Sequence, residues 1–349
     1  MNAVHLEDEG TAVLLNANAR RVSPWMRRRV RRAVAPENLY LTNSLEEAEE
    51  ATREILARGY SRVVAGGGDG TLSLLMDQLC RTAEEAPPGE QPDLPAIGVL
   101  KLGTGNALAS HVGSSSVRRD LGRLGAVGDA FDWPADDVSV PLNLIEASGR
   151  LSFFAGAGVD AMILNDYVAI KKQLRRHFAR FGEGIGTYLL ATFGRTVPRL
   201  VTTARSRPHG RIINLGRPAI RLNAKGLPMS GEDPVPTGGL LYEGPLLMAS
   251  AGTLPYYGAG MVMFPWACDR AGHMQLRIAN PPVSHLVKNM RELWQGRYDH
   301  HTLMDFHVTH VSMEFEEDFP VQVAGDAEGW QRSFELKVSP HTVPLVHLN

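Results

Sequence analysis

A glycine-rich stretch that contains an acid and a hydroxyl residue carries the strongest chemical signal in the chain. Residues 63–71 have the sequence VVAGGGDGT, so Asp69 lies among glycines and Thr71 follows them. The β-branched residues before the glycines predict the end of a buried strand, and residues 72–79 have the apolar content of a helix. Glycine permits a sharp turn and a close approach to a ligand because it carries no Cβ. A strand, a glycine turn and a helix start together predict a nest of N–H groups that binds phosphate.

A second stretch repeats this design. Residues 100–109 have the sequence LKLGTGNALA, in which an apolar run is followed by two glycines, a hydroxyl residue and the start of a helix. Two such turns at the ends of neighbouring parallel strands converge at the carboxyl edge of the sheet, where α/β proteins bind ligands. The spacing of the first turn differs from G-x-G-x-x-G, and no lysine follows it as in a Walker A loop. Those two phosphate motifs are therefore excluded.

The order of predicted elements explains how these turns are positioned. Apolar runs at 11–16, 38–42, 62–65 and 96–100 predict strands, with helices between them. One of these helices starts at Ser44, with Glu47 three residues later as in a capping box, and Gly59 ends it. Strands that alternate with helices predict a parallel α/β sheet. After about residue 130, short segments of alternating apolar residues predict a β-rich region, interrupted by a helical insert at 162–192.

Length and composition limit the class of protein. At 349 residues the chain exceeds a typical single core, so two domains are expected. The net charge of −2 gives no indication of nucleic acid as a partner. Cys80 and Cys268 are far apart, which is typical of reduced thiols in a cytoplasmic protein. Residues 1–10 lack the apolar core of a signal peptide, and no stretch reaches the ~18 apolar residues of a membrane span.

The two glycine turns resemble a known family. Residues 67–71 resemble the GGDGT signature of the diacylglycerol kinase catalytic family, which includes bacterial lipid kinases and sphingosine kinases, and NAD kinases share a related signature. Residues 100–109 are similar to the family segment P-x-G-T-G-N-D-F-A, with Lys101 in place of the proline and Ala107 in place of the Asp. The resemblance implies that the turns bind the phosphates of ATP. The residues it assigns to the nucleotide are Asn16, Thr42, Gly66, Gly67, Gly68, Asp69, Gly70, Thr71, Gly103, Thr104, Gly105 and Asn106.

The family fold is also implied. It combines an NAD kinase-like α/β domain with a parallel sheet and a β-rich, β-sandwich-like C-terminal domain, with a cleft between them. On this chain we expect the nucleotide-binding domain at residues 1–137 and the lipid-acceptor domain at 138–337. In the family the last strand returns to the first domain, and residues 338–349 are expected to do so here.

Three further segments resemble the family in part. Residues 154–161, FAGAGVDA, are similar to its G-x-G-F-D-A turn and contain Asp160. Residues 256–267 resemble the glycine-rich segment that leads into P-x-A-x-x-x-D-G, but Ala271 stands where that Asp is expected. The family's structural magnesium site uses this Asp together with backbone oxygens, and the sequence assigns it no residues.

The third segment implies the general base. Residues 321–328, VQVAGDAE, resemble a strand end that reads V-D-G-E in the family, where the Glu is the base. Aligning the glycines places Ala324 at the Asp and Asp326 at the Glu. Glu328 is a second candidate, because residues two apart on an extended strand point the same way. The alternative is an acidic turn without a catalytic role.

The resemblance therefore implies an ATP-dependent kinase that phosphorylates a hydroxyl of a lipid, such as diacylglycerol or a ceramide-like or sphingoid-like lipid. Mg²⁺ would bridge the phosphates with help from Asp69, and Asp326 would accept the proton of the attacking hydroxyl. Such an enzyme is expected to be cytoplasmic, to contact the membrane surface peripherally and to form a homodimer. The basic residues at 171–180 suit an interfacial amphipathic helix or a solvated helix face, and those at 27–32 could meet nucleotide phosphate or anionic lipid.

Two alternatives remain open at this stage. One is a kinase of a soluble acceptor such as NAD. The other is a non-catalytic homologue that binds a nucleotide or a lipid, since Pro141, Ala271 and Ala324 stand where the family has acids.

Overall fold

The computed structural model describes residues 10–19, 22–87, 89–103, 105–114, 139–162, 207–258 and 260–346. Thr104, nearly all of the helical insert expected at 162–192 and the basic residues at 171–180 lie outside the described residues. The chain divides into two compact units. Unit 1 contains Met1–Leu144, Gly258–Gly260 and Pro340–Asn349, and unit 2 contains Ile145–Tyr257 and Met261–Ser339. The sequence places the corresponding boundaries at 137 and 338.

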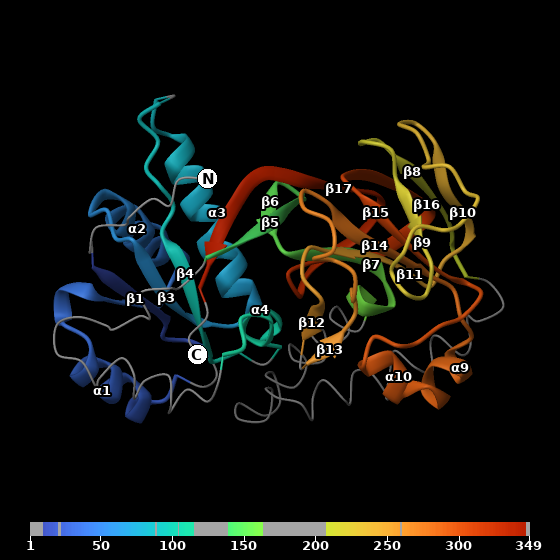
Figure 1. Ribbon diagram of the computed structural model, residues 1–349. Helices are drawn as coiled ribbons and strands as arrows, with labels where there is room; N and C mark the ends of the chain where they lie inside the picture. Colours follow the sequence, from blue (N-terminus) through green and yellow to red (C-terminus); the bar gives the residue numbers. More distant parts are fainter. Residues whose placement is uncertain are drawn as a thin grey trace. The chain divides into compact units, whose positions relative to one another are not determined.

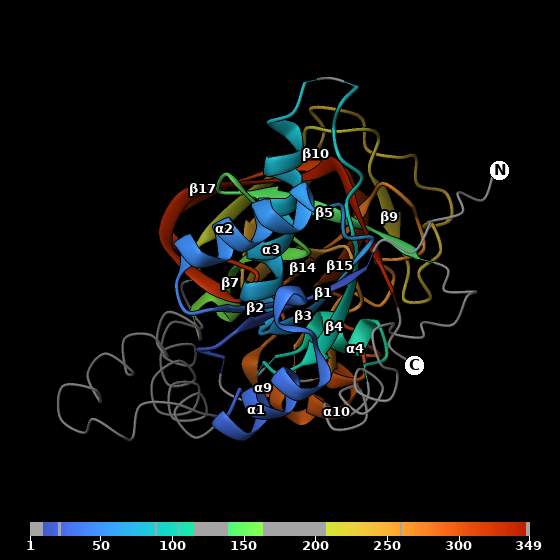
Figure 2. The same ribbon diagram turned by 90° about the vertical axis from the view of Figure 1, so that its left-hand side faces the viewer.

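Unit 1 is built on a parallel sheet in the strand order β2-β1-β3-β4 (Figure 1). The last residues of β17 add a further parallel strand, in which Leu345 pairs with Ile97. Helices α2 and α3 lie on one side of this sheet and α1 lies on the other (Figure 2). The expected α/β region with parallel strands is thus confirmed. The strands are β1 (Thr11–Asn16), β2 (Leu39–Thr42), β3 (Arg62–Gly67) and β4 (Ala96–Lys101), and the helices are α1 (Pro24–Ala33), the 3-10 turn η1 (Pro36–Asn38), α2 (Leu45–Ala57), α3 (Asp69–Glu84) and α4 (Ala107–His111).

Local sequence signals explain the helix boundaries in unit 1. Ser23 caps α1 by accepting a hydrogen bond from the backbone N–H of Met26, and a proline occupies the first helical position. Ser44 caps α2 in the same way, accepting from the N–H of Glu47 at 3.2 Å. The Glu47 carboxylate accepts from the N–H of Asn43, so it reaches back one residue beyond the cap. These short-range bonds agree with the capping box expected from the sequence.

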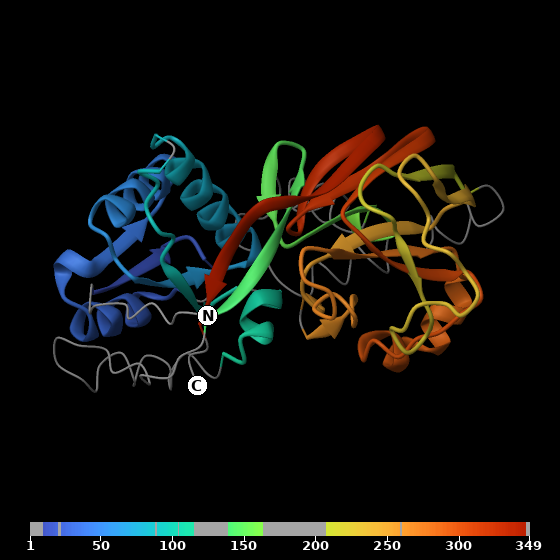
Figure 3. The ribbon, with the colours of Figure 1, turned by 45° about the horizontal axis from the view of Figure 1, so that its top comes forward.

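Unit 2 is mostly antiparallel β structure, as expected. Its main sheet runs in the order β16-β7-β11-β14-β15-β9, and its apolar side chains form one large buried cluster. The long strand β17, red in Figure 3, pairs with β16 in unit 2 before it joins the sheet of unit 1. The strands that lie wholly in unit 2 are β6 (Arg150–Ser152), β7 (Phe154–Gly158), β8 (His209–Asn214), β9 (Ile220–Leu222), β10 (Leu240–Pro245), β11 (Met248–Gly252), β13 (Met261–Val262), β14 (Met274–Ala279), β15 (Leu303–Val308) and β16 (His310–Val323), while β5 (Val140–Ala147), β12 (Tyr256–Gly258) and β17 (Asp326–Leu345) each have residues in both units.

Two short helices in unit 2, α9 (Val283–Lys288) and α10 (Met290–Trp294), have no counterpart among the elements expected from the sequence. Within the described part of the chain, no helix is both long enough and apolar enough to cross a bilayer.

Candidate active site

The predicted nucleotide residues lie at the carboxyl ends of the four parallel strands of unit 1. Asn16 ends β1 and pairs with Thr42 at the end of β2. The first glycine turn follows β3, where Gly66 pairs with Leu15 on one side and with Leu100 on the other. The second turn follows β4. The fold therefore places all of these residues, apart from the undescribed Thr104, along one edge of one sheet, where α/β proteins bind ligands.

The first glycine turn leads directly into α3. Gly68 is the N-cap of this 16-residue helix, and no side chain caps its first turn. The N–H groups of a first helical turn lack partners within the helix and lie at the positive end of its dipole. Thr71, in the same turn, accepts a hydrogen bond from the Asn16 amide at 3.0 Å, which ties α3 to the end of β1. The geometry is that of an anion-binding helix start.

The two turns approach each other more closely than side chains would allow. A Cβ built on Gly103 would lie 2.5 Å from the Cα of Gly68, and one built on Gly67 would lie 2.6 Å from the Cβ of Thr71. Because the first of these neighbours is backbone, it cannot move aside as a flexible side chain would. Glycine at 103 is therefore required by the contact between the turns.

Asp69 connects the first turn to the second. Its carboxylate is buried, and Oδ1 accepts a hydrogen bond from the N–H of Leu108 at 3.4 Å. A Cβ on Gly105 would lie 2.4 Å from Oδ2, so the second turn also encloses the other oxygen. Burial raises the pKa of Asp69 to about 6, while the backbone N–H groups around Leu108 act in the opposite direction. Asp69 is thus a desolvated acid held between two backbone turns.

The second turn is closed by its own side chain. The Asn106 amide accepts from the N–H of Gly103 and donates to the carbonyl of Gly103, both at 2.8 Å. Asn106 has a φ of 56°, a left-handed conformation that asparagine adopts more readily than most residues. Since the N–H groups at the start of α4 point to Asp69, the two turns serve different purposes. The first turn presents the start of α3, and the second holds Asp69 against it.

The candidate base lies in unit 2, on the tight turn between β16 and β17. Ala324 and Gly325 have φ values of 53° and 81°, and the flanking residues Val323 and Asp326 pair with each other. This is the backbone of a two-residue hairpin, which requires positive φ at both central positions. Gly325 suits such a turn, whereas Ala324 adopts it at a cost of roughly 1–2 kcal/mol.

Arg150 contacts both candidate carboxylates, a connection that no local sequence pattern indicates. Its guanidinium lies 3.9 Å from Asp326 Oδ2 and also contacts Glu328. Side-chain exposure is 60% for Asp326 and 25% for Glu328, so Asp326 is the more accessible acid. Loss of hydration to the surrounding protein raises the pKa of Asp326, Arg150 acts to lower it, and the charge of Glu328 acts to raise it.

A buried polar network lies behind this turn. Asp160 Oδ2 accepts hydrogen bonds from Ser250 at 2.9 Å and from the hydroxyl of Tyr257. Gln322 donates to Tyr257 at 2.9 Å, and its carbonyl oxygen accepts from the N–H of Gly325 at 2.9 Å. The turn that carries Asp326 is therefore anchored to Asp160, which the sequence marks only as part of a glycine-rich motif. A network of this kind restricts the turn to one position because its members are buried.

Magnesium ligands are sparse on the protein side. Among the described residues, no group of three or more His, Cys, Asp or Glu side chains could hold a metal ion. At the family's structural magnesium position Ala271 supplies no carboxylate, and the Arg217 guanidinium donates to the carbonyl of Gly272 at 2.9 Å. A guanidinium on the backbone oxygen does not fit a divalent cation there, since hard cations need several free oxygen ligands.

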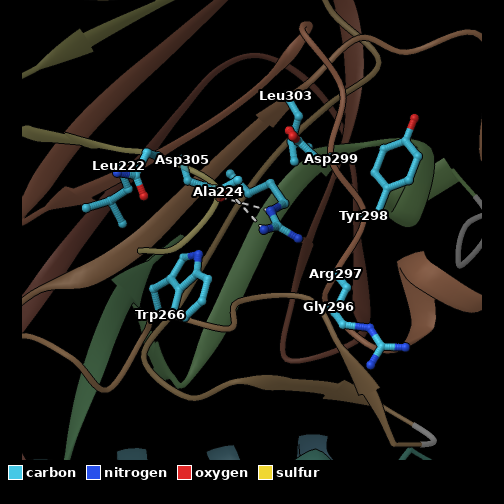
Figure 4. Close-up of a pocket in the computed structure, with 11 residues that line it drawn as sticks. Leu222, Ala224, Trp266, Gly296, Arg297, Tyr298, Asp299, Leu303 and Asp305 are labelled. Carbon is cyan, nitrogen blue, oxygen red and sulfur yellow. Dashed lines mark hydrogen bonds and ion pairs between the residues drawn. The ribbon is translucent and has the colours of Figure 1, made fainter. Parts of the chain in front are cut away.

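Two other groups of charged side chains make contacts within the protein itself. In α1, Arg27 donates to the carbonyl of Ala17 at 2.9 Å, so this basic side chain supports the loop after β1. In unit 2 a cavity of about 60 Å³ contains the buried pair of Arg277 and Asp305, joined by two bonds of 2.9 Å (Figure 4). Gln275 also donates a hydrogen bond to Asp305 at 2.8 Å, so the carboxylate of this ion pair has a third donor.

Comparison with known proteins identifies the class that this fold and site define. Residues 12–125 match the diacylglycerol kinase catalytic domain, which includes both glycine turns. The resemblance to this family that the two glycine turns indicated is thus confirmed over residues 12–125.

Individual relatives agree with this assignment. The lipid kinase YegS of Escherichia coli (strain K12) is 34% identical over 85 residues, which are 24% of this chain and 26% of that protein. A probable lipid kinase YegS of Escherichia coli O9:H4 (strain HS) has the same identity and coverage. The chain thus spans about a quarter of the length of the curated relatives it matches, at 26%.

Solved structures match over nearly the whole chain. A diacylglycerol kinase structure from Bacillus anthracis str. Sterne has a TM-score of 0.56 at 13% identity and covers 97% of both chains. A putative diacylglycerol kinase from the same organism has a TM-score of 0.59 at 14% identity, with the same coverage. At this identity the likeness concerns the fold alone, and it covers unit 2 as well as unit 1.

Proposed function

We propose that the protein is an ATP-dependent lipid kinase that transfers the γ-phosphate to a hydroxyl of a lipid such as diacylglycerol or a ceramide-like or sphingoid-like lipid. The observation that carries the proposal is the uncapped start of α3 behind a glycine turn, packed against Gly103, within a domain of the diacylglycerol kinase catalytic family. A Cβ on Gly103 would lie 2.5 Å from the Cα of Gly68, so a side chain there would push the two turns apart.

The nucleotide is held, in this proposal, by backbone groups. The turn at Gly66–Thr71 offers the N–H groups of α3 to the phosphates, and the turn at Gly103–Asn106 forms the adjoining wall. Asn16 and Thr42 border the same edge of the sheet. When bound, Mg²⁺ would neutralise phosphate charge, with phosphate oxygens and water as most of its ligands, because the described residues offer no ready-made cage. In this proposal Asp69 is the carboxylate that would assist the bound ion.

Asp326 is proposed as the general base. Its carboxylate would accept the proton of the lipid hydroxyl as the hydroxyl oxygen bonds to the γ-phosphorus and the bond to the leaving ADP breaks. Glu328 is the second candidate, but it lies against Arg150 and is less exposed. A loose phosphoryl-transfer transition state needs little early deprotonation, so a carboxylate with a modestly raised pKa is sufficient.

The proposal is tested by incubating the full chain with radiolabelled ATP, Mg²⁺ and a panel of lipid alcohols. The label is then counted in the organic extract and in the aqueous phase. Label in the organic phase that is lost with Asp326→Asn supports a lipid kinase with this base. Transfer of label to NAD or another soluble acceptor would show a different substrate class and contradict the proposal.

A binding protein without transfer activity is the second candidate. Ala271 and Ala324 stand where the family has acids, and this observation favours it. Tight ATP binding by calorimetry together with no transfer to any lipid of the panel would establish that function instead.

We also propose that the protein acts in the cytoplasm at the membrane surface and forms a homodimer. Sedimentation equilibrium of the purified chain measures the dimer directly.

A further inference from the structure

Helices α9 and α10 present large apolar side chains to solvent. Val287 is 54% exposed, Met290 is 45% exposed and Trp294 is 43% exposed. Met290 and Trp294 are four residues apart in α10 and therefore lie on one face of it, and Val287 belongs to the last turn of α9. Asn289 ends α9 and begins α10, where its carbonyl accepts a hydrogen bond from the N–H of Leu293, so the two short helices follow each other with one residue between them. These three side chains form an apolar stripe along residues 287–294, about two helical turns long, without a cover among the described residues.

Basic residues border this stripe. Lys288 and Arg291 follow Val287 and Met290 by one residue each, so they lie about 100° further round the helix, and both are exposed. Over residues 283–297 the chain has three basic residues, Lys288, Arg291 and Arg297, and one acid, Glu292. Glu292 lies beyond Lys288, on the side away from the stripe. The exposed face is therefore apolar in its centre and positive at its border.

Side chains beside the stripe hold the two helices in place. Leu286 and Leu293 are partly buried, and His285 forms a hydrogen bond with the hydroxyl of Tyr298 at 2.9 Å. At the end of α10, a Cβ on Gly296 would lie 2.6 Å from Val262 Cγ1, so the chain packs tightly against β13. These contacts anchor the helices to unit 2, while Val287, Met290 and Trp294 remain about half exposed.

We propose that this exposed face, Val283–Arg297, is a membrane-docking surface that binds a bilayer containing anionic phospholipid. Trp, Met and Val side chains enter the boundary between headgroups and acyl chains, while Lys and Arg beside them meet the phosphates. The charge complementarity favours this occupant over a second copy of the chain, whose same face would bring like charges together. This docking surface rests on the proposed function in one respect, because a kinase whose acceptor is a lipid must reach the bilayer that contains the lipid.

Vesicle sedimentation tests the surface without reference to catalysis. Wild-type protein is mixed with vesicles of phosphatidylcholine alone and of phosphatidylcholine with phosphatidylglycerol, in the absence of nucleotide. We expect binding to the anionic vesicles that weakens with salt. Met290→Ser combined with Trp294→Ser is expected to weaken it at least tenfold. Lys288→Gln with Arg291→Gln is expected to weaken it about 20-fold on anionic vesicles, since each basic residue contributes roughly fivefold.

Matched controls use exposed residues elsewhere in unit 2. Leu227→Ser removes a side chain that is 59% exposed, and Arg332→Gln removes a guanidinium that is 72% exposed. Both variants should bind vesicles as the wild type does. The docking variants should keep the thermal midpoint and the activity on a short-chain, dispersed lipid alcohol, which shows that folding and chemistry are intact.

The outcomes separate this inference from the proposed function. Vesicle binding that depends on the stripe, found in a protein that phosphorylates no lipid, would support the docking surface and contradict the kinase. Unchanged binding in the docking variants, or a wild type that does not sediment with vesicles, would overturn the docking surface. Neither result would contradict the proposed kinase activity, which the lipid-panel assay tests separately. Loss of dimerisation in the same variants would assign the face to a second copy of the chain and overturn the proposal.

Discussion

Replacing Asp69 by asparagine should make the protein more stable at neutral and alkaline pH. Burial raises the pKa of Asp69 from an ordinary 3.8 to about 6. The folded state then holds its proton more tightly than the unfolded state, so this group's contribution to stability falls as pH rises between about 4 and 6. Because the pKa of Asp69 is higher by roughly 2 in the folded state, ionising it at a pH well above 6 lowers the free energy of unfolding by about 3 kcal/mol. The amide of the Asp69→Asn variant would carry no charge to desolvate and would still accept from the N–H of Leu108.

The assay compares urea denaturation of wild type and Asp69→Asn at about pH 4.5 and about pH 8. If the new amide N–H₂ group finds no acceptor between the turns, it costs about 1–3 kcal/mol at every pH. Subtracting the difference between variant and wild type at one pH from the difference at the other pH removes this constant cost. The free energy of unfolding of the variant relative to wild type should therefore increase by about 2 kcal/mol between the two pH values.

Asp93→Asn is the control, because Asp93 is an exposed loop acid of the same unit and its replacement should give no such pH-dependent difference. A difference near zero for Asp69→Asn, or one of the opposite sign, would refute the assignment of Asp69 as a desolvated acid. If the variant gains stability while transfer of phosphate falls at least 100-fold, the carboxylate is retained for function at the expense of stability. Full activity in the variant would remove Asp69 from the mechanism.

Three further predictions concern the turns and the candidate base. Gly103→Ala should lower the free energy of unfolding by about 1–3 kcal/mol in urea and weaken ATP binding in calorimetry, because its Cβ would meet the Gly68 backbone; unchanged ATP affinity would contradict the packing of the turns. Asp326→Asn should reduce kcat about 10²–10⁴-fold with little change in KM for ATP, and Asp326→Glu should recover part of it; a fully active Asn variant would exclude this base. Arg150→Gln should move the acidic limb of the pH–rate profile upward, since Arg150 lowers the pKa of Asp326; a limb that stays in place would show that Asp326 does not control the rate.

Several features follow from the sequence because their causes are local. The glycine turns can be predicted since only residues without a Cβ permit the close approach, and the start of α2 can be predicted since Ser44 bonds to an N–H three residues away. The alternation of strands and helices likewise predicts the parallel sheet of unit 1 from short apolar runs. The two glycine-turn motifs, being stretches of consecutive residues, could be found in the same way, and they lie within the match over residues 12–125.

Features that depend on distant partners could not be predicted. The hydrogen bond between Leu108 and Asp69 joins residues that are 39 positions apart in the sequence, and the contact between Arg150 and Glu328 joins residues that are 178 positions apart. The sequence shows that Asp69 lies in the first glycine turn and that Asp326 follows Gly325. It does not show that the backbone near Leu108 binds Asp69 or that Arg150 lies beside Asp326. The apolar stripe on α9 and α10 was missed for a related reason. A periodic apolar pattern has the same appearance whether its face is buried or exposed, and only the packing of the other face distinguishes them.

The sequence by itself therefore determined the class of protein, the parallel sheet and the two turns at its carboxyl edge, because backbone freedom and strand order are encoded in neighbouring residues. The tertiary structure decided that the turns have unequal roles, with the first presenting the start of α3 and the second burying Asp69. It also decided that Asp326 shares Arg150 with Glu328 and that an apolar helical face remains uncovered among the described residues. The physical reason is that burial, and with it the pKa of an acid or the exposure of a tryptophan, is a property of everything packed around a residue.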